Sequence, residues 1–196
     1  MGIYLISTPA GWVATAWTGR GLGGLDFPRT SPEEALVSIR GMFVSTGEMP
    51  VYEQAGINSP AGALEEKLNR YFQGEEVSFA GIPVDISWCT PFQRQVLEFV
   101  RQIAYGELWS YRQVAAAIGR PRAIRAVGGA LGENRVPLVI PCHRVVRHDG
   151  SPGGFGGGLA LKSRLLALEG REPGPGGRYR LTNRAACGNI IDASGL

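Results

Sequence analysis

Cysteine and histidine are scarce in this chain of 196 residues, which has three cysteines and two histidines. The cysteines, Cys89, Cys142 and Cys187, are odd in number, widely spaced and form no CxxC pair. This pattern argues against a disulfide framework and a zinc knuckle, and it favours a reducing compartment. Both histidines, His143 and His148, lie in one short segment, so the N-terminal half offers no histidine to a metal. We therefore expect neither a metal nor a cofactor.

Long apolar runs are missing too, because no stretch approaches the roughly 20 apolar residues that cross a bilayer. Residues 1–6 carry no basic side chain, so we expect no secretory signal. Hydrophobic residues make up 44% of the chain and charged residues 19%, which suits a globular protein of one large domain or two small ones. We expect a protein of the cytoplasm, or of the nucleus in a eukaryote, without a membrane partner.

The formal net charge is only +3, but the charges are unevenly placed. Residues 1–89 carry 5 basic and 10 acidic side chains, whereas residues 90–170 carry 11 basic and 5 acidic ones. Nearly all the basic residues of the second part are arginines, which suit phosphate recognition. This asymmetry favours a polyanionic partner for the second part, although a solvated basic surface would give the same count.

The pattern of the first 88 residues predicts a mixture of strands and helices. Ser31 as a cap, Pro32 at the first helical position and two acidic residues after it mark the start of one helix. Residues 41–58 give no clear signal. In chain order we predict a hairpin at 3–17, a glycine-rich turn region at 21–30, helices at 32–40 and 61–72, and a strand with a turn at 74–86.

Beyond a predicted domain boundary near residues 88–90, the pattern becomes helical. Thr90, followed by Pro91 and Gln93, is a helix start with a capping box. Two short helices then flank a Gly-Arg-Pro turn, and the second carries arginine near its start, as in a helix-turn-helix. The predicted elements are a helix from 91 that ends before 105, helices at 111–118 and 123–131, a short buried strand at 136–140, a glycine-rich loop at 149–158, a helix at 159–169 and a flexible tail at 171–196.

A cysteine followed by a histidine stands inside the apolar run from Ile140 to Val146. A thiol is a nucleophile as its thiolate, and an adjacent base or positive charge produces that form near neutral pH. Pro141 fixes its own φ angle and restricts the residue before it, so Cys142 would be held on a stiff backbone. Taken alone, however, such a pair is more often a buried structural cysteine beside a chance histidine.

The surrounding residues change that balance, because Asn134 to Val146 resembles the active-site signature of the O6-alkylguanine-DNA alkyltransferases. The resemblance is strong over about residues 88–170 and weaker over residues 1–87, and the tail shows none. The further blocks that carry it are Thr90-Pro91-Phe92-Gln93, Tyr105-Gly106, Ser110-Tyr111, Arg125-Ala126-Val127-Gly128-Gly129-Ala130, Leu165-Leu166-Ala167-Leu168-Glu169-Gly170, Tyr71-Phe72-Gln73-Gly74 and Phe79-Ala80-Gly81-Ile82-Pro83-Val84-Asp85.

The resemblance implies an α/β (α+β) fold in two domains. Residues 1–88 would form a ribonuclease-H-like antiparallel sheet with helices, and residues 89–170 a winged helix-turn-helix-like domain. The implied reaction transfers an alkyl group irreversibly from O6 of guanine, and also from O4 of thymine, to Cys142. His143 would take the thiol proton through a bridging water, and Glu169 would orient the imidazole.

Other roles are implied by the same resemblance. Asn134 would tie the recognition helix to the active-site strand, Tyr111 would help to flip the nucleotide, and Arg125 would fill the gap left in the stack. The implied DNA contacts also include Ala123, Ala126, Gly128, Arg112, Arg122 and Arg135. The implied base pocket comprises Leu131, Pro137, Val145, Phe155, Gly156 and Lys162. The many glycines of the loop 151–158 suggest mobility, which would admit alkyl groups bulkier than methyl.

The family further implies a monomer that binds double-stranded DNA containing O6-alkylguanine through the minor groove, with affinity that falls as salt rises. Three alternatives stay open from the sequence. One is a non-enzymatic alkyltransferase-like protein that only binds the lesion, although such relatives often replace the cysteine with tryptophan. The others are a helix-turn-helix regulator in which the Cys-His pair is incidental, and a cysteine hydrolase.

Overall fold

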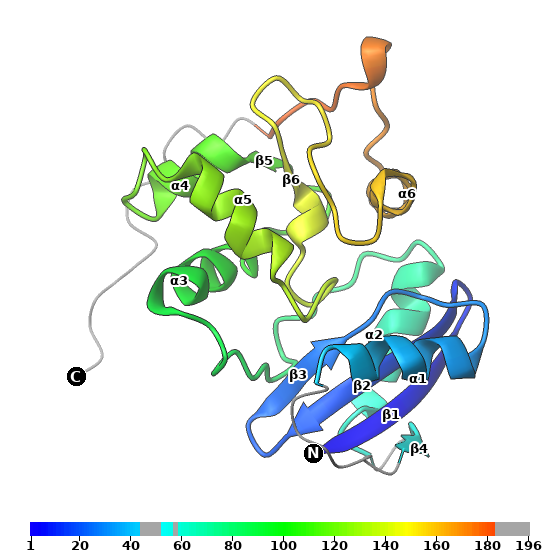
Figure 1. The fold of residues 1–196 in the computed structure, drawn as a ribbon. Coiled ribbons are helices and arrows are strands. Elements are labelled where there is room, and N and C mark those ends of the chain that lie inside the picture. Colours follow the sequence, from blue (N-terminus) through cyan, green and yellow to red (C-terminus); the bar gives the residue numbers. More distant parts are fainter. Residues whose placement is uncertain (44–51, 57–58, 183–196) are drawn as a thin grey trace.

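The computed structural model describes residues 1–43, 52–56 and 59–182 (Figure 1). The first part of the chain forms a sheet with two helices, and the second part is mainly helical. The predicted mixed α/β class is therefore confirmed. One buried apolar cluster contains side chains from both parts, for example Leu68 and Val96, so the exact domain boundary stays a prediction.

The N-terminal sheet has the strand order β3-β2-β1-β4. Strands β1 (Gly2–Thr8) and β2 (Gly11–Thr18) form the predicted hairpin, and β3 (Gly21–Leu25) pairs antiparallel with β2. Strand β4 (Tyr52–Gln54) differs from the expected antiparallel sheet because it runs parallel to β1. It lies in the stretch that gave no clear signal in the sequence.

Strand β3 corrects the predicted turn region at 21–30. Three glycines in five residues hide the strand from its side-chain pattern, and the structure shows why glycine is used. A Cβ atom at Gly21 would come within 2.5 Å of the Pro83 carbonyl oxygen, and one at Gly24 within 2.7 Å of the Phe43 ring. The glycines therefore allow neighbouring segments to approach the backbone closely.

One helix covers each face of the sheet (Figure 1). Helix α1 (Pro32–Gly41) starts as predicted, with the Ser31 hydroxyl accepting from the Glu34 N–H, and its buried residues form a small cluster with β1 and β2. Helix α2 (Gly62–Phe72) places Leu64, Leu68 and Tyr71 in the larger cluster that continues into the C-terminal part. The face of the sheet under α2 thus belongs to the same core as the C-terminal helices.

The predicted strand at 74–86 is wrong. This segment contains turns and makes only a bridge from Val84 to Leu22. Val77, Phe79 and Ile82 are nonetheless buried, which explains the misleading apolar pattern. Because Pro83 has no N–H, a regular ladder could not pass through it.

The C-terminal helices begin where the capping signals placed them. Helix α3 (Pro91–Val100) has both hydrogen bonds of the Thr90–Gln93 capping box, which is worth about 1 kcal/mol. Ser110 caps α4 (Tyr111–Ala117) in the same way, and α5 (Ile124–Gly132) follows after the turn. Helices α4 and α5 contact each other and α3 packs on both, which is the predicted helix-turn-helix arrangement.

The segment 136–140 is buried as predicted, but it is a turn rather than a strand. Leu138 has φ +69°, a conformation that bulky residues rarely adopt and that no strand can contain. The backbone then forms a 3₁₀ helix, Cys142–Arg144, and strand β6 (Val145–Val146), which pairs parallel with β5 (Trp109–Ser110). Strained backbone therefore leads directly into the Cys-His pair.

Helix α6 (Leu159–Leu168) is the last of the predicted helices. The residues after it were predicted to form a flexible tail, and for residues 171–182 that prediction is wrong. Tyr179 is 5% exposed and packs with Leu108, Val146 and Leu166. Its backbone N–H donates to the Gly150 carbonyl at 2.8 Å. Residues 171–182 are thus packed onto the C-terminal part, whereas 183–196, including Cys187, lie outside the described residues.

Candidate active site

Cys142 sits at the start of the 3₁₀ helix and is partly exposed. Asn134, just after α5, donates from Nδ2 to the Ile140 carbonyl at 2.9 Å and to Cys142 Sγ at 3.2 Å, while its Oδ1 accepts from the Val136 N–H. These bonds agree with the expected tie between helix and active-site segment. They also place a donor on the sulfur, which sequence reasoning missed.

His143 is fully buried and lies beside Glu169. Its Nε2 is 2.7 Å from Glu169 Oε1. Since a carboxylate only accepts, Nε2 carries the proton and Nδ1 keeps its lone pair. Nδ1 has no hydrogen-bond partner within the described ranges. The imidazole therefore has one nitrogen fixed by the carboxylate and one available to take a proton.

Glu169 receives more donors than the sequence predicted. Arg144 donates from Nε to Oε2 and from Nη2 to Oε1, both at 2.9 Å, and the Gly106 N–H donates to Oε2 at 3.1 Å. The Tyr71 hydroxyl donates to Oε1 at 2.8 Å. Arg144 and Gly106 lie in motifs that we noted, but spacing alone gave no reason to pair them with Glu169. Tyr71 comes from α2, in the other part of the chain.

The electrostatic setting follows from burial and these contacts. Burial raises the pKa of the Cys142 thiol, and the Asn134 hydrogen bond and the Lys162 charge oppose that rise. Burial lowers the pKa of His143, which favours the neutral imidazole. Burial would raise the pKa of Glu169, but hydrogen bonds and charges from His143 and Arg144 outweigh it and hold this pKa well below its usual range. The resting state is a thiol beside a neutral imidazole and a carboxylate.

Lys162 on α6 is fully buried, which argues against a merely solvated lysine. Its ammonium donates to the carbonyls of Val145 and Pro152 and lies 5.9 Å from the Phe155 ring centroid. Burial lowers its pKa to about 8, and negative charge on Cys142 acts in the opposite direction when the thiol ionises. Lys162 therefore joins the active-site strand to the glycine-rich loop and puts a positive charge near the sulfur.

The glycine-rich loop closes over Tyr111. The Tyr111 hydroxyl donates to the Gly154 carbonyl at 3.4 Å, and a Cβ at Gly153 would clash with that hydroxyl at 2.9 Å. Phe155 packs against Phe27, which follows β3, with ring centroids 5.1 Å apart. The loop is therefore anchored on both sides in this structure, and its expected mobility stays a prediction.

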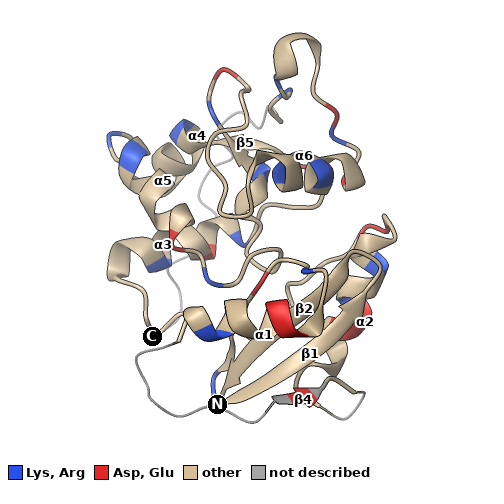
Figure 2. Cartoon of the chain, turned by 45° about the vertical axis from the view of Figure 1, so that its right-hand side comes forward, with Lys and Arg blue, Asp and Glu red and all other residues tan. Residues whose placement is uncertain are grey.

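The residues expected to contact DNA divide into two groups. Arg112, Arg122, Arg125 and Ala126 are exposed on α4, the turn and α5, and Ala123 and Gly128 are half-buried there. Figure 2 shows basic positions, in blue, on α4, on α5 and on the turn between them. Arg135 lies apart from them: its guanidinium sits 4.7 Å from the Trp88 ring centroid. The DNA contacts of both groups stay predictions.

The expected pocket residues differ in burial. Leu131 and Val145 are buried in the cluster against which Cys142 and Phe155 pack. Pro137 is buried in the turn before Cys142, and Gly156 is exposed in the loop.

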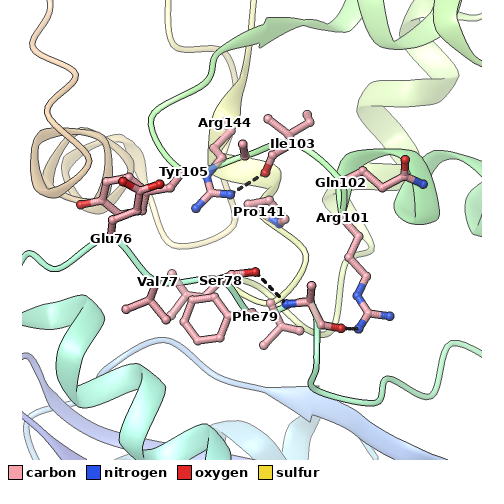
Figure 3. Close-up of a pocket in the computed structure, with 14 residues that line it drawn as sticks. Glu76, Val77, Ser78, Phe79, Arg101, Gln102, Ile103, Tyr105, Pro141 and Arg144 are labelled. Atoms are coloured by element: carbon pink, nitrogen blue, oxygen red, sulfur yellow. Dashed lines mark hydrogen bonds between the residues drawn. The ribbon is translucent and has the colours of Figure 1, made fainter. Parts of the chain in front are cut away.

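A separate cavity of about 520 Å³ opens behind this site (Figure 3). It is lined by residues 76–80 and 101–105 and by Leu138, Val139, Pro141 and Arg144. Figure 3 shows Arg144 donating to the Ile103 carbonyl beside it. Cys142 is not among the lining residues, so this cavity is not the entrance to the thiol.

The described residues contain no group of three or more His, Cys, Asp or Glu side chains that could hold a metal ion. No helix among them is both long and apolar enough to span a membrane.

Comparison with known proteins places these residues in a family. The family model described as "6-O-methylguanine DNA methyltransferase, DNA binding domain" matches residues 91–171. A methylated-DNA–protein-cysteine methyltransferase of Rattus norvegicus is 37% identical over 178 residues, covering 85% of this chain and 80% of the relative. One from Haemophilus influenzae is 41% identical over 122 residues, 62% of this chain. The chain spans only 63% of that relative's length, which is less than two thirds.

Solved structures agree with the sequence comparison. The Mycobacterium tuberculosis protein OGT in complex with DNA has a TM-score of 0.67 and 31% identity, covering 86% of this chain and 92% of that one. An O6-methylguanine-DNA methyltransferase of Pyrococcus kodakaraensis has a TM-score of 0.62 and 25% identity, covering 86% and 98%. On the sequence match across both parts of the molecule, this chain belongs to the methylated-DNA–protein-cysteine methyltransferase family.

Proposed function

We propose that this chain repairs DNA by moving an alkyl group from O6 of guanine to Cys142 in a single, irreversible turnover. One observation supports the proposal most directly. A partly exposed thiol accepts from Asn134 and stands next to an imidazole whose other nitrogen is fixed by Glu169. This is the arrangement of an activated nucleophile, and it lies beside a helix-turn-helix with exposed arginines.

The reaction balances with groups already at the site. Cys142 passes its proton to His143, through a water if the two side chains are not in contact, and the thiolate attacks the alkyl carbon. The S–C bond forms as the bond from carbon to O6 breaks, and the electron pair remains on the guanine. Glu169 stabilises the imidazolium that results. Because a thioether is a poor leaving group, the protein reacts once.

Tyr111 is suited to the charge left on the base. Burial and the nearby Cys142 raise the pKa of its hydroxyl, so it stays protonated and able to donate to the guanine ring. Its ring lies by α5, since a Cβ at Gly128 would be 3.9 Å away. A hydroxyl in this place would also crowd the phosphate of a nucleotide entering the site, which promotes flipping.

The proposed partner is duplex DNA that contains O6-alkylguanine or O4-alkylthymine, bound by a monomer. A base inside a duplex keeps its O6 edge away from a protein pocket, so the nucleotide has to leave the stack. Arg125, exposed in the first turn of α5, is placed to occupy the gap. The affinity should be dominated by phosphate contacts and should fall steeply with salt.

The test is the intact mass of the protein after mixing with a duplex that carries one O6-methylguanine. We expect a gain of one CH₂ unit on the peptide that contains Cys142. Cys142→Ala should gain nothing, whereas Cys89→Ala, which removes a buried thiol, should gain as much as the unmodified chain. A protein that binds the lesion and gains no mass would instead be a lesion-binding protein without transfer activity.

A further inference from the structure

Tyr71 connects the N-terminal part of the chain to the reacting residues. It lies in the last turn of α2 and is completely buried. Its hydroxyl donates to Glu169 Oε1 at 2.8 Å, across 98 positions in the sequence. The same hydroxyl is 3.4 Å from His143 Nε2. Tyr71 therefore stands where the carboxylate and the imidazole meet.

The remaining donors to Glu169 all come from the C-terminal part. They are His143, Arg144 and the Gly106 N–H. Of the residues before position 90 that the structure describes, Tyr71 alone bonds to this carboxylate. Oε1 thus accepts from Tyr71, His143 and Arg144, and three donors on one oxygen restrict how far the carboxylate can turn.

The Tyr71 ring is held on several sides, so the hydroxyl has little freedom. Phe72, Phe79 and Tyr105 contact it edge-on, at centroid distances of 5.4, 5.8 and 6.2 Å. Burial and the Glu169 charge raise the pKa of Tyr71 well above its usual value, while the Arg144 charge opposes them. The hydroxyl therefore remains a donor throughout the working pH range.

We propose that Tyr71 is a positioning residue for the transfer, which sets how strongly Glu169 attracts the proton that His143 takes from Cys142. The proposal rests on the function proposed above. The charged and titratable groups that act on the imidazole are Glu169, Arg144, Lys162 and Tyr71. Among these, Tyr71 comes from the N-terminal part, so the basicity of the imidazole depends on both parts of the chain.

Removing the Tyr71 hydroxyl should raise the pKa of His143, because both groups donate to the same oxygen, Glu169 Oε1. The Tyr71 hydroxyl withdraws negative charge from Glu169 Oε1. Without it, the carboxylate attracts the imidazolium more strongly, so the pKa of His143 rises. The unprotonated imidazole then exists only at higher pH, and the acid limb of the rate profile moves in that direction.

The test is Tyr71→Phe, which keeps the ring and removes the hydroxyl. We expect the methyl-transfer rate at pH values below the acid limb to fall about three- to tenfold, because the rate there follows the unprotonated fraction of His143. We also expect the acid limb to move up by roughly half to one pH unit. The rate should be measured in single-turnover reactions with an O6-methylguanine duplex, between pH 5 and pH 9.

Tyr105→Phe is the matched control. Tyr105 lies against the same ring, and its hydroxyl donates to the Leu168 carbonyl at 2.6 Å without bonding Glu169. We expect a similar loss of thermal stability and an unmoved acid limb. If Tyr71→Phe folds and leaves both rate and acid limb unchanged, or if Tyr105→Phe moves the limb equally, the positioning role is overturned.

A second variant covers the case in which Tyr71→Phe does not fold. Tyr71→3-fluorotyrosine keeps the ring and strengthens the donor, so the acid limb should move to lower pH. A limb that stays in place, or moves upward, contradicts the proposal. If the unmodified chain transfers no methyl group at all, the proposed function has failed. If it transfers normally while these variants behave like it, only the role of Tyr71 has failed.

Discussion

The two parts of the molecule bury charge in different ways. In the C-terminal part, four ionisable side chains are buried together around Cys142: His143, Arg144, Lys162 and Glu169. In the N-terminal part the buried charges are Asp26 and Asp85 among the described residues, and each is satisfied near the surface, by Arg29 and by Thr18 respectively. Burying charge costs free energy unless it is paired and hydrogen-bonded. Its concentration in one part therefore marks where the chemistry is performed.

The N-terminal part reaches the same site with uncharged groups. Tyr71 supplies a hydroxyl to Glu169, and Phe27 supplies a ring to Phe155 of the loop. The C-terminal part thus carries the buried charged side chains of the site. Residues 1–90 contribute uncharged side chains that hold Glu169 and the loop in place. Three predictions test that division, starting with the largest expected effect.

Glu169→Gln should break the C-terminal charge cluster. The amide keeps the shape of the side chain but cannot stabilise the imidazolium, and its NH₂ opposes donors from Arg144 or Gly106. We expect the transfer rate to fall about 10²- to 10⁴-fold, as when the third member of a triad is lost. The transfer rate is measured in quenched single-turnover reactions with a labelled O6-methylguanine duplex.

Glu172→Gln provides the control, because Glu172 is exposed three residues later. It should react like the unmodified chain. Circular dichroism has to show that Glu169→Gln is folded, since an unpaired buried arginine is costly. A folded Glu169→Gln within threefold of normal rate would show that the buried charge is structural, and the comparison between the two parts would lose its meaning.

The proposed nucleophile could be predicted from the sequence, since Cys142 and His143 are neighbours and the family signature around them is local. The capping box at Thr90 likewise predicted a helix start that the structure confirms, and the helix predicted from residue 111 begins there, capped by Ser110. Such signals lie within a few residues of each other. The contact between Tyr71 and Glu169 spans 98 positions, and no local spacing indicates it.

Another miss has an equally physical cause. The predicted strand at 136–140 failed because Leu138 adopts a positive φ angle, which an apolar run does not reveal. An apolar run therefore predicts burial but not backbone conformation. Arg135 is a different case: the resemblance implies a DNA contact, and its guanidinium lies over Trp88 while its carbonyl accepts from the Leu25 N–H, so the DNA contact stays a prediction.

A second prediction compares the only two lysines in the chain, Lys162 in the active site and Lys67 in the N-terminal part. Burial lowers the pKa of Lys162 to about 8, from 10.5 in the unfolded chain. Between these values the unfolded state binds more protons, so the penalty for burying the charge is full below pH 8 and is relieved as pH rises to 10.5. Stability should therefore rise by about 3 kcal/mol across that window.

Urea unfolding at pH 7.5 and pH 10 measures this as a difference between the unmodified chain and Lys162→Met. Groups that do not interact with Lys162 titrate alike in both proteins, so their contributions cancel; Cys142, whose pKa depends on the Lys162 charge, is replaced by Ala in every protein compared. Lys67, whose ammonium donates to the Ser78 carbonyl at the surface, serves as the control through Lys67→Met. If the free energy of unfolding depends on pH equally in all three proteins, the charge of Lys162 is no more costly to bury than that of Lys67. The two parts of the molecule would then not differ in the cost of buried charge.

The smallest expected effect comes from replacing Phe27, whose ring packs against Phe155 of the glycine-rich loop. Phe27 packs on Phe155 at 5.1 Å, and Phe155 in turn faces the Lys162 ammonium. An aromatic pair of this kind contributes about 0.5–1.5 kcal/mol, which corresponds to roughly a two- to tenfold change in a rate ratio. Phe27→Ala should free the loop to open for large groups. The rate with O6-benzylguanine, divided by that with O6-methylguanine, should therefore rise by this factor.

Competition between the two lesions in otherwise identical duplexes gives the ratio from one mass spectrum, because the adducts on Cys142 differ in mass. Phe27→Leu, which keeps most of the apolar volume and removes the ring, should fall between Phe27→Ala and the unmodified chain. The methyl reaction is the internal control, since a general loss of folding lowers both rates and leaves their ratio unchanged. An unchanged ratio in Phe27→Ala would confine the choice of alkyl group to the C-terminal part. A raised ratio would extend the role of residues 1–90 from positioning the carboxylate to limiting what the thiol accepts.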